Sequence, residues 1–264
     1  MTIKFTILGC GSSGGVPRIG NDWGMCDPTN SKNRRLRCSI MVEKIAPTGT
    51  TRVVIDTSPD LREQMLSNKV SEIDAVWYTH EHADHTHGID ELRVFYLRQR
   101  QRIPVWADQS TAAMLISRFA YCFVAPDGSN YPPIAEHHLI TPETEIGTQG
   151  QGGALSSLPF KVHHGNIDAL GFRIGNVAYT PDVNGIPDAS LKHLEGLDIW
   201  IVDALRHKPH PSHFSLAETL EWIARMKPKQ AIITNMHVDL DYDTLCQQLP
   251  PNVMPAYDGM NFSA

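Results

Sequence analysis

Short apolar segments, several alternating with polar residues, recur along the chain and predict β-strands. In the first of these, at 3–8, Ile3, Phe5 and Ile7 would share one face. Further strands are predicted at 39–43, 52–55, 74–79, 103–107, 158–164, 171–174, 177–180, 199–204 and 230–235, with a closing turn or strand at 255–259. Gly175 and Asn176 would form the turn of a hairpin.

Helix-like segments alternate with these strands. They are predicted at 88–101, 110–122, 215–226 and 242–249. Ser215 and Glu218 form a capping box that would begin the third of them. Residues 125–153 are rich in turn formers and would hold edge strands and loops. Two halves with the same order of elements predict a single α/β domain over 1–264, with two mixed sheets face to face and helices outside.

Composition narrows the class of protein. The 264 residues include 41% hydrophobic residues, enough for a sizeable core, and carry a formal charge of −6, which argues against a protein that coats long nucleic acid. No apolar run is long enough for a membrane-spanning helix, so no membrane partner is expected. Five cysteines without a CxxC pair fit free thiols in a reducing compartment, so a cytoplasmic location is expected.

The strongest chemical signal is a cluster directly after the predicted strand at 74–79. Four potential metal ligands lie within six residues: His80, His82, Asp84 and His85. In an extended turn, His80 and His82 point the same way and can bind one cation, while Asp84 and His85 turn toward a neighbouring position. Imidazole and carboxylate ligands suit Zn²⁺, and also Mn²⁺ or Fe²⁺.

Three later strand ends offer further ligands. A His163-His164 pair follows one strand, Asp182 follows the hairpin, and His237 follows the strand at 230–235. A bridging carboxylate is the usual means of holding two cations about 3.5–4 Å apart. Together these residues supply what the first cluster lacks for a site with two metal ions.

The motif His80-x-His82-x-Asp84-His85, followed by a histidine, an aspartate after a hairpin and a late histidine, resembles the metallo-β-lactamase superfamily. The resemblance implies a four-layer αββα sandwich and two divalent metal ions, Zn²⁺ or Mn²⁺. It implies that His80, His82 and His164 bind the first metal, that Asp84, His85 and His237 bind the second, and that Asp182 bridges them. Between His163 and His164, we choose His164. Asp56 would lie behind the loop that carries His80 to His85 and support it.

Finer features resemble the phosphodiesterase branch, which includes phosphoribosyl cyclic phosphate phosphodiesterase and, more distantly, ribonuclease Z. These features are the glycine-rich segment 9–15 and a histidine, His213, just before a capped helix. The cysteine-rich structural zinc site of the former enzyme is reduced here to Cys26, so a structural zinc is not expected. The resemblance implies hydrolysis of small cyclic phosphodiesters or nucleotides by a metal-bridging hydroxide. His213 would donate a proton to the leaving group, and Asp84 is placed with it in the catalytic group.

Three alternatives stay open at this point: a tRNA 3′-end endonuclease of the ribonuclease Z kind, a thioester hydrolase, and a non-enzymatic nucleotide- or metal-binding scaffold. The arginines at 34–37 and 93–102 could guide a nucleotide, but the segment 125–153 has no lysine or arginine with which to hold tRNA. We therefore expect a small phosphodiester or nucleotide as partner rather than long nucleic acid. A homodimer is expected only from the resemblance.

Overall fold

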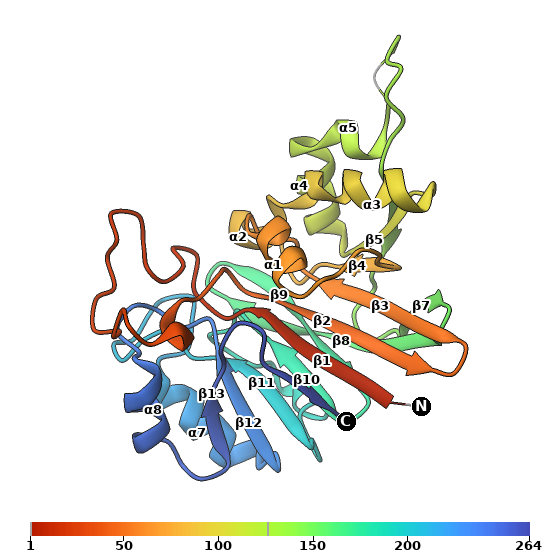
Figure 1. Cartoon of the computed structure of the whole chain (residues 1–264). Coiled ribbons are helices and arrows are strands. Elements are labelled where there is room, and N and C mark those ends of the chain that lie inside the picture. The colour runs from red at the N-terminus through yellow and green to blue at the C-terminus, as the bar shows by residue number, and fades with distance from the viewer. Residues whose placement is uncertain (1, 126) are drawn as a thin grey trace.

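The computed structural model describes residues 2–125 and 127–264, and its core is two seven-stranded sheets that pack face to face with helices on the outside (Figure 1). The predicted αββα sandwich is therefore confirmed. Residue 126, inside the segment expected to hold edge strands and loops, lies outside the described residues. Both sheets mix parallel and antiparallel neighbours.

The first sheet has the strand order β14-β1-β2-β3-β4-β5-β6. Its strands are β1 (Thr2–Gly9), β2 (Ser39–Ala46), β3 (Gly49–Ile55), β4 (Ala75–Trp77), β5 (Ile103–Ala107), β6 (Ala135–Leu139) and β14 (Asn261–Ser263). The second sheet has the order β13-β12-β11-β10-β9-β8-β7. Its strands are β7 (Ile146–Gly150), β8 (Gly153–His164), β9 (Ile167–Ile174), β10 (Val177–Thr180), β11 (Ile199–Asp203), β12 (Gln230–Thr234) and β13 (Val253–Pro255).

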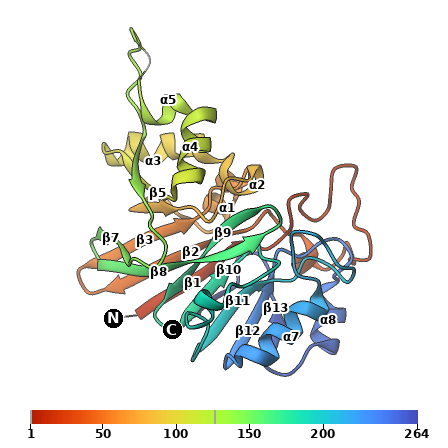
Figure 2. The ribbon, with the colours of Figure 1, turned by 180° about the vertical axis from the view of Figure 1, so that it is seen from behind.

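Helices cover the outer faces of both sheets (Figure 2). The α-helices are α1 (Leu61–Ser67), α2 (Ala83–Thr86), α3 (Leu92–Gln99), α4 (Gln109–Arg118), α5 (Ala120–Phe123), α6 (Asp188–Leu191), α7 (Leu216–Met226) and α8 (Tyr242–Gln248), and the 3-10 turns are η1 (Ser31–Asn33) and η2 (Ile89–Glu91). The predicted capping box of Ser215 and Glu218 begins α7.

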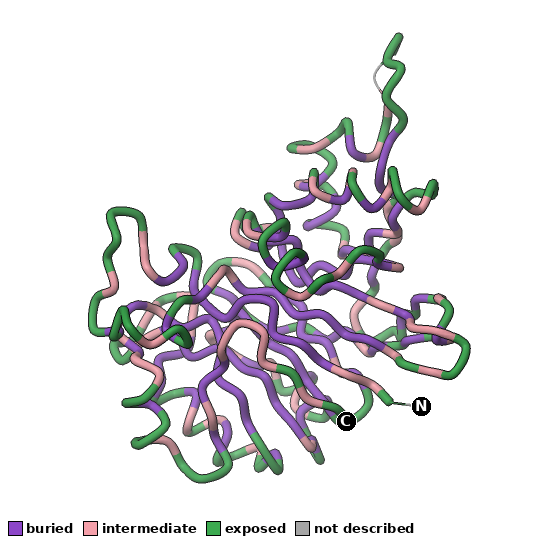
Figure 3. Tube along the Cα trace, viewed as in Figure 1, coloured by how far each residue is buried: buried purple, intermediate pink, exposed green. Residues whose placement is uncertain are grey.

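Successive side chains of a strand point to opposite faces of its sheet, so the core is divided into two layers. In β1, Phe5 and Ile7 face the second sheet, while Leu8 faces the helices that cover the first sheet. Between the sheets, Trp77 of β4 packs against Phe172 of β9 with ring centroids 5.8 Å apart. The central strands are buried along most of their length, and many exposed residues lie in the connecting loops (Figure 3).

Several elements differ from the predictions. Helix α1 was not predicted, because its buried face consists only of Leu61, Gln64 and Met65. The helix expected at 88–101 is divided into η2 and α3, and Arg100, directly after α3, has a left-handed conformation. Strand β14 was also missed, and it pairs with β1, so the end of the chain joins the sheet of the first half. Over the described residues, no helix is long and apolar enough to cross a membrane.

The topology brings the chemically interesting loops to one end of the sandwich. Strands β3 and β4 are parallel, as are β10, β11 and β12, so their carboxyl ends lie at matching edges of the two sheets. The long segment between β1 and β2 extends at the same end, beside the loops that follow β11 and β12 (Figures 1 and 2). This end therefore positions the candidate site.

Candidate metal centre

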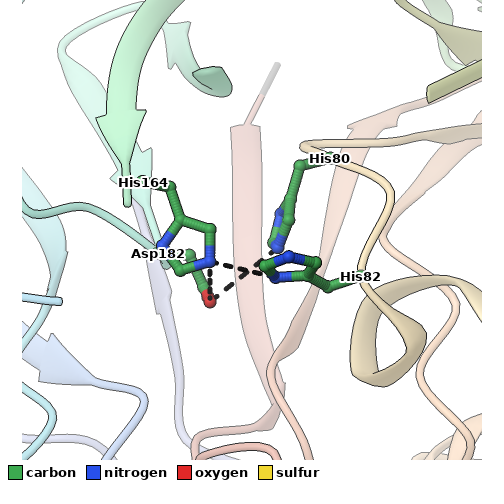
Figure 4. A group of neighbouring side chains, drawn as sticks. All are labelled: His80, His82, His164 and Asp182. Carbon is green, nitrogen blue, oxygen red and sulfur yellow. Dashed lines mark hydrogen bonds and ion pairs between the residues drawn. The ribbon is translucent and has the colours of Figure 1, made fainter. Parts of the chain in front are cut away.

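Two groups of side chains with metal-binding atoms converge at this end of the sandwich. The first group consists of His80, His82, His164 and Asp182, and the second of Asp84, His85 and Asp182. Within each group the candidate ligand atoms all lie within 4.8 Å of one another. In Figure 4 the four side chains of the first group point toward one another from the loop after β4, the end of β8 and the loop after β10.

Asp182 belongs to both groups, and its two carboxylate oxygens face different partners. Oδ2 lies 3.9 Å from Nε2 of His80 and 3.5 Å from Nε2 of His164. Oδ1 lies 3.0 Å from Nε2 of His85. A carboxylate oriented in this way can bridge two cations.

Hydrogen bonds on the far side of the imidazoles fix their orientation. Nδ1 of His85 lies 2.7 Å from Oδ2 of Asp56, and Nδ1 of His164 donates to the carbonyl oxygen of Ser212 at 2.6 Å. Asp56 is fully buried and also accepts from the backbone N–H and the hydroxyl of Thr79, both at 2.8 Å. The Nε2 atoms of His85 and His164 therefore point toward the centre, an arrangement typical of histidine ligands to metals.

Two buried ring nitrogens of the centre are free to bind cations. Nε2 of His80 and Nε2 of His85 are both buried, and among the described residues neither has a hydrogen-bond partner in suitable geometry, although Oδ1 of Asp182 lies 3.0 Å from Nε2 of His85. Buried polar atoms in proteins are almost always paired, so two orphaned ring nitrogens beside a shared carboxylate fit the metal ions that the resemblance implies.

Electrostatics within the cluster are strongly coupled. Burial, reinforced by the neighbouring His85, lowers the pKa of His80 well below its usual value. Burial opposes the charged form of His85, but Asp182, Asp56 and Asp84 raise its pKa well above the usual value. Burial also opposes the charge of Asp182, yet His85 and other neighbouring histidines hold its pKa well below the usual range. Asp182 therefore supplies negative charge that attracts the neighbouring histidines.

The two adjacent histidines of β8 point to opposite faces of the strand. His164 is buried in the first group, whereas the exposed His163 places its Nδ1 3.1 Å from Oδ1 of Asp168. The structure thus brings His164, the histidine that we chose, to the other candidate ligands.

His213, expected to donate a proton, lies beside the centre but belongs to neither group. Its Nε2 is 3.8 Å from Oδ2 of Asp182, and its Nδ1 is 2.7 Å from Oδ2 of the buried Asp203. Burial opposes the charge of His213, but Asp203 raises its pKa to about 9. With Nδ1 held by Asp203, Nε2 of His213 is directed toward Asp182.

The structure does not bring His237, expected as a ligand of the second metal, into either group. Nδ1 of His237 lies 2.9 Å from Oδ1 of Asp239, and its Nε2 lies 3.3 Å from Nη1 of Arg18. Asn235, two residues earlier, approaches the centre instead: its Nδ2 donates to Oδ1 of Asp182 at 3.2 Å.

Three residues of the site were not given a role from the sequence: Thr79, Asp203 and Asn235. Asp203 and Asn235 stand where β11 and β12 end, which is the same signal that identified Asp56 after β3. A systematic search of strand ends for carboxylates and amides would have found both. The carbonyl oxygen of Ser212 carries no such signal, because every residue has one.

Comparisons with known proteins identify the family and support the fold. A family model described as "Beta-lactamase superfamily domain" matches residues 51–236, which is most of the chain. A solved structure described as a new diphosphatase from the PhnP family is 36% identical, with a TM-score of 0.89, covering 100% of this chain and 98% of the other. The structure of Zn²⁺-bound PqqB from Methylobacterium extorquens is 17% identical, with a TM-score of 0.76, covering 98% of this chain and 99% of the other, and shows the fold alone.

One curated protein is similar along nearly the whole chain. It is named octanoyltransferase, from Porphyromonas gingivalis (strain ATCC BAA-308 / W83), and is 29% identical over 263 residues, which is 98% of this chain and 51% of that protein. The chain therefore spans about half the length of this relative.

Proposed function

The chain belongs to the metallo-β-lactamase superfamily, and on that premise we propose that it is a dinuclear metal-dependent phosphodiesterase that acts on small substrates. The observation that carries the proposal is the position of Asp182, whose two oxygens face separate groups of ligand atoms. Two divalent cations bound there, Zn²⁺ or Mn²⁺, would supply an activated water and neutralise negative charge on phosphate oxygens.

The residues of the chain have distinct tasks in this proposal. The first group would hold one cation and the second group the other, while Asp56 and the carbonyl oxygen of Ser212 keep the imidazoles of His85 and His164 in orientation. Asp84 would act with the catalytic residues as a ligand of the second cation. Its side chain is partly exposed, so it lies where solvent and substrate can reach it.

His213 would protonate the leaving oxygen. Its Nδ1 is held by Asp203, so the proton available for transfer sits on Nε2, the nitrogen nearer to Asp182. General acid catalysis of this kind typically contributes about 10²–10⁴-fold to the rate. Burial lowers the pKa of His213, but the carboxylate of Asp203 raises it, which favours the protonated donor.

A phosphorus substrate is favoured by the diphosphatase name of the 36%-identical neighbour. The name suggests that a phosphoanhydride belongs among the candidate substrates, beside cyclic phosphodiesters and nucleotides. The octanoyltransferase name belongs to a protein about twice as long, so we do not extend that activity to this chain.

A matched pair of variants tests the proposal. The metal-reconstituted chain should hydrolyse bis-p-nitrophenyl phosphate, and His164→Ala should lose most of that activity together with bound metal. His163→Ala is the control, because it removes the adjacent imidazole that points away from the centre. Equal activity of the two variants would contradict the proposal.

A substrate panel then identifies the class of substrate. It contains ribose cyclic phosphates, cyclic nucleotides, a dinucleoside diphosphate, precursor tRNA and thioesters. Hydrolysis of thioesters without any phosphoester would replace the proposal with a thioesterase, and cleavage of precursor tRNA alone would replace it with an endonuclease.

A further inference from the structure

We propose that Arg18 binds a second phosphate group of the substrate, one that is not cleaved, and thereby favours substrates with two phosphate groups over those with one. This inference rests on the proposed function, because it takes the metal centre as the place where the reacting phosphate is held. Arg18 lies on the long segment between β1 and β2, which extends beside the loops that follow β11 and β12 (Figure 1). It was given no role from the sequence.

The guanidinium of Arg18 lies against the loop that follows β12. Its Nη1 is 3.3 Å from Nε2 of His237. Two residues before this histidine, Nδ2 of Asn235 donates to Oδ1 of Asp182 at 3.2 Å. The same Nδ2 lies 3.2 Å from Nδ1 of His213. One short loop thus contacts both the bridging carboxylate and the guanidinium, so Arg18 stands at the rim of the proposed reaction site.

Backbone pairing fixes the position of Arg18. Its N–H donates to the carbonyl oxygen of Asp22 at 2.9 Å, and the N–H of Asp22 donates back at 3.2 Å, so the two residues close a short turn. Two residues before Arg18, Val16 exchanges backbone hydrogen bonds of 2.9 and 2.8 Å with Arg35. Arg35 is buried, and its Nη1 donates to the carbonyl oxygen of His237 at 3.3 Å. The segment that carries Arg18 is therefore tied to the loop after β12, which positions the guanidinium before any substrate binds.

The guanidinium of Arg18 is available to a stronger partner than those it has. A guanidinium carries five N–H donors. Nη2 is paired with Oδ2 of Asp22 at 2.8 Å, and the two side chains are 41% and 48% exposed. Exposed ion pairs of this kind contribute little to stability, and an imidazole nitrogen is a weaker acceptor for Nη1 than a phosphate oxygen is. Phosphate oxygens also match the planar fork of an arginine, so that two parallel hydrogen bonds can form.

The charges on this side of the rim favour an anion beside Arg18. Divalent cations in the centre would repel a guanidinium close to them, and the ion pair with Asp22 offsets only part of that repulsion. The loop after β11 adds the positive charge of Arg206 at the same end of the sandwich. The nearby carboxylate of Asp239 is directed to the other ring nitrogen of His237, Nδ1, at 2.9 Å. A second phosphate group would supply the missing negative charge, because the reacting phosphate is already neutralised by the cations.

Nucleotide binding to the metal-loaded, full-length chain tests the proposal without turnover. The probes are AMP, adenosine 3′,5′-bisphosphate and the non-hydrolysable α,β-methylene analogue of ADP. Isothermal titration calorimetry gives each dissociation constant, and native mass spectrometry checks that the bound metal stays the same. We expect at least one of the two probes with a second phosphate group to bind about 10-fold more tightly than AMP, the size of one charge-assisted interaction.

The two probes also distinguish the possible arrangements of the second phosphate group. The ADP analogue places it next to the first, as in a diphosphate, and the bisphosphate places it across the ribose. The tighter of the two shows which arrangement Arg18 recognises. Affinities of both probes within about twofold of that of AMP would overturn the proposal.

Substitutions of Arg18 test whether this residue causes the preference. In Arg18→Gln the preference should fall to within about twofold, because the amide carries no charge. A merely structural role would weaken the binding of all three probes alike and leave their ratio unchanged, which would overturn the proposal. Arg18→Lys should retain part of the preference, since it keeps the charge but loses the planar fork.

Arg34→Gln is the matched control for these variants. It removes the same charge from the same segment, at a side chain that is exposed to solvent. We expect it to keep the full preference, and a loss equal to that of Arg18→Gln would overturn the proposal by showing that only the overall charge matters. Because these affinities are measured without turnover, failure of the phosphodiesterase assay would contradict the proposed function and leave the binding result intact.

Discussion

His85 and Asp56 form a buried pair in which Nδ1 of the imidazole lies 2.7 Å from Oδ2 of the carboxylate, with both side chains fully excluded from solvent. Asp56 stands just after β3 in a left-handed conformation, φ 67°, and His85 lies on α2, which follows β4. The pair thus ties together two loops that leave neighbouring parallel strands. Its effect is to direct Nε2 of His85 toward Asp182.

Asp56→Asn should weaken metal binding by about 10–100-fold, the usual cost of losing a carboxylate behind a histidine ligand. The amide retains the volume of the carboxylate but removes the charge that orients and polarises His85. Metal affinity is measured by chelator competition on the purified variant. Asp74→Asn is the control, because Asp74 also accepts a backbone N–H, from Arg52, but lies at the opposite end of β4. An equal effect of both substitutions on metal affinity would contradict the assigned role of Asp56.

His213→Ala should lower the turnover of a phosphodiester with a poor leaving group by about 10²–10⁴-fold while both metal ions remain bound. The expected reason is loss of the proton donor that Asp203 positions. The loss should be smaller for an activated nitrophenyl ester, whose leaving group needs less protonation. His210→Ala serves as the comparison, because the His210 ring lies 5.1 Å from that of His213, centroid to centroid. Full activity of His213→Ala on the poor leaving group would exclude the assignment.

Asp258 should make the free energy of unfolding depend on pH. Burial raises the pKa of this carboxyl to about 7, although it accepts hydrogen bonds from the backbone N–H groups of Leu36 and Cys10. The folded chain then holds the proton more tightly than the unfolded chain does. Asp258 therefore stabilises the fold fully below about pH 4, and this contribution is lost as the pH rises through about 7.

Asp258→Asn should remove this part of the fall in the free energy of unfolding with rising pH, because the amide does not titrate. Chemical denaturation at several pH values between about 4 and 8 gives the two curves, and their difference isolates Asp258 from other buried carboxyls. Parallel curves for the two proteins would show that Asp258 has no such effect.

Gly171→Ala should destabilise the sandwich by about 1–3 kcal/mol through overpacking. An added Cβ would lie 2.5 Å from Cζ of Phe160 and 2.8 Å from Cγ2 of Thr180, and both of these residues are buried. Gly147→Ala on the edge strand β7 is the control, because its nearest contact would be 3.8 Å away, at the carbonyl oxygen of Leu155. Thermal unfolding of the two variants should show a lower midpoint for Gly171→Ala alone.

The sequence was most informative where the information is local. The strands were predicted well because alternation such as that of Phe5, Ile7 and Leu8 records which face is buried. The hairpin turn was predicted from the turn-forming residues Gly175 and Asn176, and Ile174 pairs with Val177 across it. Helix α1 was missed because its apolar face is too short to produce a periodic signal.

The sequence by itself determined the order of the strands that carry the site and a cluster of ligand types packed into the short stretch from His80 to His85. Such features persist in any conformation, because neighbours in the chain remain neighbours in space. Only the tertiary structure decided that His164 points inward and His163 outward, that His237 pairs with Arg18, and that Asn235 reaches Asp182. Those choices depend on strand twist and on backbone conformation at strand ends. For Asn235 and His237 they also depend on partners more than 50 positions away, which the local pattern does not reveal.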